Sequence, residues 1–287
     1  MPAPLPKKFT IADLRAARKT GRKVAMLTCY DFTTARLMQE AGVPSLLVGD
    51  SAANVILGYD TTLPVSLSFM IELTTAVRRG APLSLVVADM PFGSYHGSLD
   101  RGVRNVCQMV KRTGCDAVKL EAGATQLPLI RVLADAGVAV IAHLGLRPQS
   151  VGVLGSYRFQ GRTAADASAI VALATEMAEA GAAGILLEAV PPEVSAAVVG
   201  AVAIPVIGCG AGPACDGHVF VTHDAVGLTE RSPRFVPALG DLAQPMLAHF
   251  SEYVRLVENN EYPAPEHCYD MPADEREKFE KERVVGF

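Results

Sequence analysis

The chain has 287 residues, half of them hydrophobic, with no Trp and a formal net charge of −4. Such a chain can bury one large core or two ordinary ones. Its Lys and Arg residues form no long run, which disfavours nucleic-acid binding because that function needs a basic footprint. Residues 1–23 lack the apolar core of a signal peptide, and no apolar stretch could span a bilayer. We therefore expect a soluble, cytoplasmic protein with neither nucleic-acid nor membrane partners.

The first predicted element is a helix near the N-terminus. Thr10 suits the N-cap of a helix that begins at Ile11, and we expect this helix to close the bottom of a barrel. A repeating unit follows, in which a helix-like segment ends in Gly and a short apolar run then ends in a polar residue. Glycine suits the left-handed position after a helix. Short continuous apolar runs are typical of a parallel sheet that helices cover on both faces.

Eight of these runs are predicted to be strands, each linked to a helix. Eight such units in a chain near the ~250 residues typical of the fold predict a (β/α)8 TIM barrel with an N-terminal helix and a C-terminal helical extension. An open doubly wound sheet is the alternative, because both folds use the βαβ unit. The predicted strands lie within residues 23–31, 41–50, 80–90, 113–123, 136–145, 180–189, 203–212 and 218–224, the last being the weakest.

The C-terminal region is predicted to be helical. Residues 239–260 have the pattern of a final helix, and the densely charged segment 272–283 indicates a solvated helix or a frayed tail. We therefore expect one catalytic barrel domain over residues 1–271 and a charged tail over residues 272–287.

Polar side chains occur at the ends of the second to the sixth predicted strands. Barrel enzymes carry their chemistry at these C-terminal strand ends, where side chains from different strands converge on one cavity. Each residue alone has a structural explanation, such as capping a turn or, for a histidine, being a satisfied core residue. Together they predict a site, because the rest of each strand is apolar. The residues are Asp50, Ser51, Asp89, Lys119, Glu121, His143 and Glu188.

The charges of this set point to a divalent cation. Four carboxylates face one lysine, and crowded carboxylates raise one another's pKa unless a cation intervenes. Oxygen ligands without a Cys or multi-His cluster favour Mg²⁺, with Mn²⁺ possible, over Zn²⁺. An α-keto acid could chelate this metal through its carboxylate and ketone, and the metal would act as a Lewis acid on the ketone. Lys119 would neutralise the substrate carboxylate, and Glu188 would remove a carbon-bound proton.

Several segments carry a family resemblance. They run in order from about residue 24 to 228 and include GDSAANV…GYDTTLP, LVVADMPFGSY, AVKLEAG, AHLGLRPQSV and LLEAVP. The first of these is long and specific. With these segments the chain closely resembles the ketopantoate hydroxymethyltransferase (3-methyl-2-oxobutanoate hydroxymethyltransferase) family.

The resemblance implies an enzyme of pantothenate biosynthesis, the route to the coenzyme A precursor. It implies transfer of a hydroxymethyl (one-carbon) unit from 5,10-methylenetetrahydrofolate, the co-substrate, to 3-methyl-2-oxobutanoate, through a Mg²⁺-stabilised enolate. The products would be 2-dehydropantoate and tetrahydrofolate. It also implies a homo-oligomer, with a decamer as one expected size. Carried over by position, the metal ligands would be Asp50, Asp89 and Glu121, the substrate-binding residues Asp50, Ser51, Asp89, Lys119 and His143, and the catalytic proton acceptor Glu188.

Three alternatives remain open at this point. Lys119 could form a Schiff base, as in metal-free aldolases. Other keto-acid lyases and mutases of similar barrel design also use such metal sites. A non-catalytic scaffold or ligand sensor could keep the same cavity, although the complete set of polar residues argues against it.

Overall fold

The computed structural model describes residues 5–154 and 158–285. The chain divides into two compact units, Met1–Leu239 and Gly240–Phe287. The first unit contains eight parallel strands that pair in sequence order, and β8 pairs with β1, so that the barrel is closed. The predicted (β/α)8 barrel is therefore confirmed, and the open sheet is excluded. The strands are β1 Val24–Thr28, β2 Ser45–Val48, β3 Leu85–Asp89, β4 Ala117–Glu121, β5 Val140–Gly145, β6 Gly184–Glu188, β7 Val206–Cys209 and β8 Gly217–His218.

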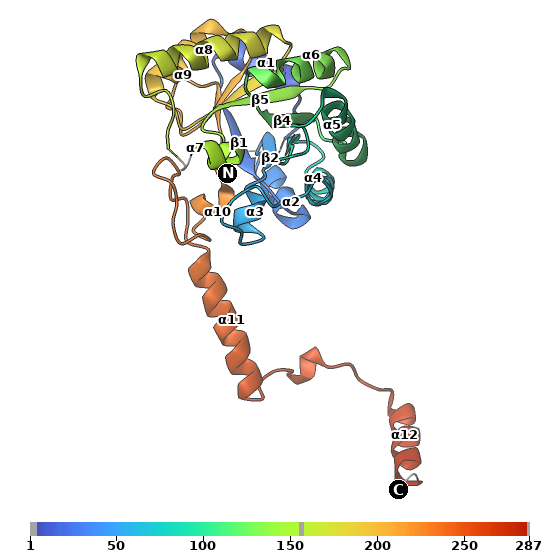
Figure 1. Cartoon of the computed structure of the whole chain (residues 1–287). Coiled ribbons are helices and arrows are strands. Elements are labelled where there is room, and N and C mark those ends of the chain that lie inside the picture. Colours follow the sequence, from blue (N-terminus) through green and yellow to red (C-terminus); the bar gives the residue numbers. More distant parts are fainter. Residues whose placement is uncertain (1–4, 155–157, 286–287) are drawn as a thin grey trace. The chain divides into compact units, whose positions relative to one another are not determined.

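Helices between the strands surround the barrel (Figure 1). Helix α5 shows why they form: the Ser98 side chain accepts the Arg101 N–H at its start, Val106 and Met109 are buried, and Gly114 ends it in the left-handed conformation. The helices of this unit are α1 Ile11–Thr20, α2 Phe32–Glu40, α3 Ala52–Val55, α4 Leu67–Gly80, α5 Leu99–Thr113, α6 Leu127–Asp135, α7 Val151–Leu154, α8 Ala164–Glu179, α9 Pro192–Ala201 and α10 Thr222–Ala225, with single 3₁₀ turns η1 Ala124–Gln126 and η2 Pro148–Ser150.

Helix α1 closes the N-terminal end of the barrel, as predicted. The Thr10 side chain and the Asp13 carboxylate cap each other's backbone N–H groups at its start. Phe9, Leu14 and Ala17 are buried in one cluster with the apolar side chains inside the barrel. Apolar side chains therefore fill this end of the barrel interior, and the polar side chains of the predicted site lie at the opposite end.

The alternation of side chains along each strand decides what lies inside the barrel. The lower interior is apolar, with Val87, Ile141 and Leu186 among its members. One step further along the strands the inward positions become polar, and Asp89 pairs in register with Lys119. The outward positions are apolar and pack in a second cluster beneath the surrounding helices.

The eighth strand is shorter than predicted. We expected a strand within residues 218–224, but β8 covers only Gly217–His218 and residues 222–225 form helix α10. The Thr222 N–H donates to Thr28 Oγ1 at 2.9 Å, and the Thr222 hydroxyl donates to the Thr28 carbonyl at 2.7 Å. These hydrogen bonds turn the chain at the end of the strand.

The second unit contains α11 Ala243–Glu258, the 3₁₀ turn η3 Pro265–His267 and α12 Ala273–Val285. We expected the barrel domain to run to residue 271, whereas the compact unit that holds the barrel ends at Leu239. No residue of α11 is buried. Across residues 5–154 and 158–285, no helix combines the length and the apolar character needed to cross a membrane.

Candidate active site

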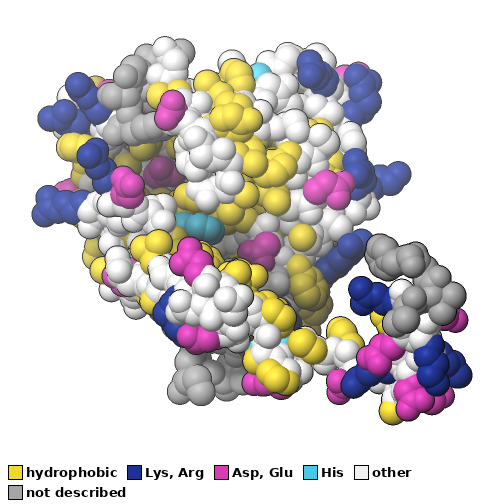
Figure 2. All heavy atoms as spheres, turned by 90° about the horizontal axis from the view of Figure 1, so that it is seen from below, with side chains coloured by type: hydrophobic (Ala, Val, Ile, Leu, Met, Phe, Trp, Pro, Cys, Tyr) yellow, Lys and Arg dark blue, Asp and Glu magenta, His cyan; other side chains and the backbone are white. Residues whose placement is uncertain are grey.

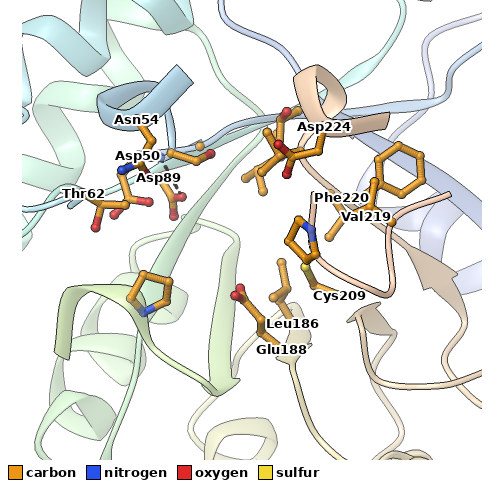
Figure 3. Close-up of a pocket in the computed structure, with 18 of the residues that line it drawn as sticks. Asp50, Asn54, Thr62, Asp89, Leu186, Glu188, Cys209, Val219, Phe220 and Asp224 are labelled. Carbon is orange, nitrogen blue, oxygen red and sulfur yellow. Dashed lines mark hydrogen bonds between the residues drawn. The ribbon is translucent and has the colours of Figure 1, made fainter. Parts of the chain in front are cut away.

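A cavity of about 470 Å³ lies at the C-terminal ends of the strands, within the usual size range of small-molecule sites. Figure 3 shows Asp50 and Asp89 together on one side of it, with Glu188 and Cys209 on another. Every residue of the predicted set except Glu121 lines this cavity. On the molecular face seen in Figure 2, Lys and Arg side chains are scattered around the margin and hydrophobic side chains gather over the middle.

Two buried aspartates lie next to each other at the ends of β2 and β3. Asp50 is 5% exposed and Asp89 2%, and the Asp50 N–H donates to Asp89 Oδ2 at 3.1 Å. A Cβ at the neighbouring Gly49 would lie 2.7 Å from Ser51 Oγ, so a larger residue there would displace that hydroxyl. Burial raises the pKa of Asp89 to about 7, although Lys119 partly offsets the rise. A bound cation would favour the ionised form of both carboxylates.

Lys119 is the cation that faces these acids. Its Nζ lies 2.7 Å from Asp89 Oδ1 and 3.2 Å from His143 Nδ1. Burial by itself lowers the pKa of Lys119, but the carboxylates of Asp89, Asp50 and Glu121 outweigh this effect and raise it above its ordinary value. The ammonium therefore stays charged and can attract an anionic group of a ligand.

His143 and Glu188 form a pair inside the cavity. An ammonium can only donate, so His143 Nδ1 accepts from Lys119 and the ring proton lies on Nε2. That nitrogen is 3.4 Å from Glu188 Oε2. Burial, followed by the charge of Lys119, keeps the pKa of His143 well below its usual range, so the ring is neutral. Burial raises the pKa of Glu188 to about 7, a suitable value for a general base at neutral pH.

The simple capping explanations do not account for Ser51 and Glu188. Ser51 precedes α3, but its side chain makes no capping hydrogen bond, and its hydroxyl lies 2.8 Å from the Tyr30 hydroxyl. Helix α9 has Pro191 as its N-cap and no side-chain cap, so Glu188 does not serve it. Both side chains line the cavity instead.

Glu121 lies just outside the cavity lining and is buried. Burial, partly offset by Lys119, raises its pKa to about 8. Both of its carboxylate oxygens accept from the backbone N–H of Gln149, at 3.0 and 3.1 Å. The Glu121 carboxylate is therefore held by Gln149, a loop residue that our sequence prediction did not include.

The acid pair fits a hard divalent cation. Within the described part of the chain, no three His, Cys, Asp or Glu side chains are gathered as a ready-made metal site. Mg²⁺ does not require one, because it commonly takes one or two carboxylates and keeps several waters. Asp89 Oδ1 is buried and, among the described residues, has no aligned hydrogen-bond donor even though Lys119 is near. Asp50 and Asp89 could therefore hold Mg²⁺ directly, with Glu121 acting through water.

The cavity also contains residues that sequence reasoning missed. Thr62 comes from a loop, where no periodic pattern marked it, and Asp224 comes from the four-residue helix α10. Cys209 could have been found, because it ends β7 and pairs in register with Glu188. Burial, with a further contribution from Glu188, raises the pKa of this thiol well above its ordinary value. Cys209 is therefore a neutral thiol in the cavity lining rather than a thiolate nucleophile.

Carboxylates and one buried lysine at the C-terminal strand ends define a (β/α)8-barrel enzyme. A family model described as ketopantoate hydroxymethyltransferase matches residues 8–265. The protein of Desulfotalea psychrophila named 3-methyl-2-oxobutanoate hydroxymethyltransferase is 41% identical over 266 residues, or 92% of this chain and 95% of that one. The protein of the same name from Corynebacterium jeikeium is 46% identical over 265 residues, covering 92% and 93%. The chain therefore belongs to the ketopantoate hydroxymethyltransferase family, a family of transferases.

Solved structures with the same fold are more distant in sequence. Phosphonopyruvate hydrolase has a TM-score of 0.60 at 15% identity, with 96% of each chain covered. A phosphoenolpyruvate phosphomutase from Streptomyces platensis subsp. rosaceus has a TM-score of 0.59 at 16% identity, covering 96% of this chain and 99% of that one. 2,3-Dimethylmalate lyase, of the PEP mutase/isocitrate lyase superfamily, has a TM-score of 0.56 at 17% identity, covering 95% and 98%. These likenesses show the barrel fold.

Proposed function

We propose that this enzyme transfers a one-carbon unit from 5,10-methylenetetrahydrofolate to 3-methyl-2-oxobutanoate. The products are 2-dehydropantoate and tetrahydrofolate, and the overall reaction consumes one water. The names of the relatives supply the keto acid and the hydroxymethyl group. The observation that carries the proposal is one cavity lined by an acid pair, a charged lysine and a carboxylate with a pKa of about 7.

The substrate is bound through complementary charges. Asp50 and Asp89 would hold Mg²⁺, or Mn²⁺, with help from Glu121, and the metal would supply Lewis-acid stabilisation of negative charge on the ketone oxygen. Lys119 attracts the carboxylate of the keto acid. Ser51, whose hydroxyl lies near that of Tyr30, offers a further hydrogen bond to this carboxylate.

Glu188 acts as the base in this proposal. It removes the proton on C3 of the keto acid. Water adds to the methylene carbon of the folate and both C–N bonds of that carbon break, so that tetrahydrofolate leaves and the carbon is released as formaldehyde. C3 then bonds to the formaldehyde carbon to form a quaternary centre, and the formaldehyde oxygen takes up a proton and becomes the new hydroxyl group. His143 Nε2 lies 3.4 Å from Glu188 Oε2 without an aligned hydrogen bond among the described residues, so a small shift of either side chain would let the ring N–H donate to the carboxylate. A pKa near 7 lets Glu188 take the proton at neutral pH and return it afterwards.

The charge state of Lys119 disfavours the Schiff-base alternative. A lysine that attacks a ketone must be a neutral amine, and such lysines have lowered pKa values. Here the surrounding carboxylates raise the pKa of Lys119. The neutral amine is therefore scarce, and an electrostatic role suits the residue better.

The proposal is tested by incubating the whole protein with 3-methyl-2-oxobutanoate, 5,10-methylenetetrahydrofolate and Mg²⁺. We expect 2-dehydropantoate and tetrahydrofolate in equal amounts, and we expect EDTA to stop their formation because the ketone then loses its Lewis acid. Mass spectrometry of the products checks both points. Consumption of the keto acid without folate would contradict the proposal and favour a lyase or mutase. Full turnover in EDTA would contradict the metal role.

We also propose that the enzyme is a homo-oligomer, with a decamer as one expected size. Helix α11 supports this, because its residues at helical spacing form an exposed apolar face. Burial of each large side chain contributes about 1.5–3 kcal/mol, and a second copy of the chain is the occupant we propose. The exposed apolar residues at α11 are Leu242, Met246, Leu247, Phe250, Tyr253, Val254 and Val257.

The variant Phe250→Glu/Val254→Glu tests this surface. We expect sedimentation velocity to show a smaller species than for the wild type, because two charges cannot be buried against an apolar partner. Ala248→Glu is the control for an added charge, since it places one glutamate on the opposite side of α11, and it should leave the size unchanged. Identical sedimentation of the double variant and the wild type would exclude this face as the interface.

A further inference from the structure

We propose that Gln149, held by Tyr95, is a positioning residue that orients the Asp50 carboxylate and links it to Glu121. The inference rests on the proposed metal site and extends it to residues beyond the acids. Gln149 lies in the 3₁₀ turn η2, after strand β5, and is 4% exposed. A buried amide needs hydrogen-bond partners, and two of the residues that Gln149 contacts, Asp50 and Glu121, are acids of the proposed metal site.

The side-chain amide of Gln149 is fully engaged. Its Nε2 donates to Asp50 Oδ2 at 2.7 Å and to the Met90 carbonyl at 3.0 Å. Its Oε1 accepts from the Tyr95 hydroxyl at 2.8 Å. The reversed amide would place its oxygen against a carboxylate and a carbonyl, so only one orientation is stable. The amide engages Oδ2 of Asp50 and leaves Oδ1 as the oxygen available to a cation.

Tyr95 connects this amide to the strand that bears Glu121. Tyr95 is buried, and its hydroxyl accepts from the Glu121 backbone N–H at 3.1 Å while its proton goes to Gln149. The backbone N–H of Gln149 donates to the Glu121 carboxylate. One loop residue therefore reaches the acids of β2 and β4, with its side chain serving Asp50 and its main chain serving Glu121.

This division of contacts makes the proposal testable by a single side-chain change. Substitution of Gln149 removes the donor to Asp50 Oδ2 but keeps the backbone N–H that holds Glu121. Outer partners of metal ligands typically change metal affinity by about 10–100-fold when they are removed. Without this hydrogen bond the Asp50 carboxylate can rotate, and cation binding is weaker because it must then fix the carboxylate in one orientation.

The experiment measures Mn²⁺ binding to the whole protein without substrate, by electron paramagnetic resonance titration. We expect Gln149→Met, of similar size and without the amide, to raise the Mn²⁺ Kd by about 10-fold or more. Tyr95→Phe should raise it less, because the Met90 carbonyl still holds the amide. The double variant should show less than the sum of both effects, since the two residues act on the same carboxylate.

Thr74→Val is the matched control for the loss of a buried polar group. Thr74 is fully buried on α4 and donates only to the Met70 carbonyl, so this variant should bind Mn²⁺ like the wild type. Circular dichroism shows that each variant is folded. If Gln149→Met does not fold, Tyr95→Phe decides the question. An unchanged Kd in folded Gln149→Met, or in Tyr95→Phe when it alone folds, would overturn the positioning role.

The wild-type protein separates this inference from the proposed function. If the wild type binds no Mn²⁺, the metal site of the proposed function fails, and the positioning role fails with it. If the wild type and folded Gln149→Met bind equally well, only the positioning role fails.

Discussion

Glu188→Gln is expected to slow exchange of the C3 proton of 3-methyl-2-oxobutanoate in deuterated water by about 10²–10⁴-fold, the usual contribution of a general base. Glutamine keeps the size of the side chain and its contact with His143 but cannot take a proton. Nuclear magnetic resonance of the keto acid with enzyme and Mg²⁺, without folate, measures the exchange directly. The measurement therefore isolates proton removal from the later carbon–carbon bond formation.

The pH dependence of this exchange also tests the role of Glu188 as the base. Burial raises the pKa of Glu188 to about 7, so the carboxylate is mostly protonated below this pH and mostly ionised above it. Only the ionised form is a base. At saturating Mg²⁺, the exchange rate of the wild type should therefore rise as pH increases through about 7, whereas the residual rate of Glu188→Gln should lack this rise.

Glu179→Gln is the matched control, because Glu179 is exposed at the end of α8. This variant should exchange the C3 proton like the wild type. Wild-type exchange by Glu188→Gln, with the same pH profile, would remove Glu188 from the role of base and leave the proton to another group.

Asp89→Asn is expected to abolish tight metal binding and to lower turnover on the order of 10³-fold. Lewis-acid stabilisation contributes several kcal/mol, and each 1.4 kcal/mol corresponds to a factor of ten. The amide keeps the size of the side chain but is a weaker ligand without charge. Titration with Mn²⁺ and steady-state turnover with Mg²⁺ measure the two effects separately.

Metal affinity of the wild type should also depend on pH. The pKa of Asp89 is raised to about 7 in the absence of a cation, so protons compete with the metal for this carboxylate below that pH. The Mn²⁺ Kd should therefore fall as pH increases through about 7. Asp135→Asn, an exposed change at the end of α6, is the control and should behave like the wild type. Unaltered Mn²⁺ binding by Asp89→Asn would place the metal elsewhere.

The barrel and most of the candidate site could be predicted because they depend on local periodicity. Alternation along a strand puts Lys119 and Glu121 on the same face, and the parallel register then brings Asp89 beside Lys119. The resemblance to a family strengthened the roles of these residues. The eighth strand was predicted too long, because the hydrogen bonds of Thr222 to Thr28 join segments far apart in sequence.

The sequence by itself determined the class of fold, the end of the barrel that carries polar groups, and the acids, lysine and histidine that converge there. These follow from backbone geometry, which repeats along every strand. Only the tertiary structure decided that Gln149 contacts Asp50, a residue 99 positions away, and that Tyr95 supports it. Side chains in irregular loops have no period to indicate their direction, so packing between distant segments alone determines their partners.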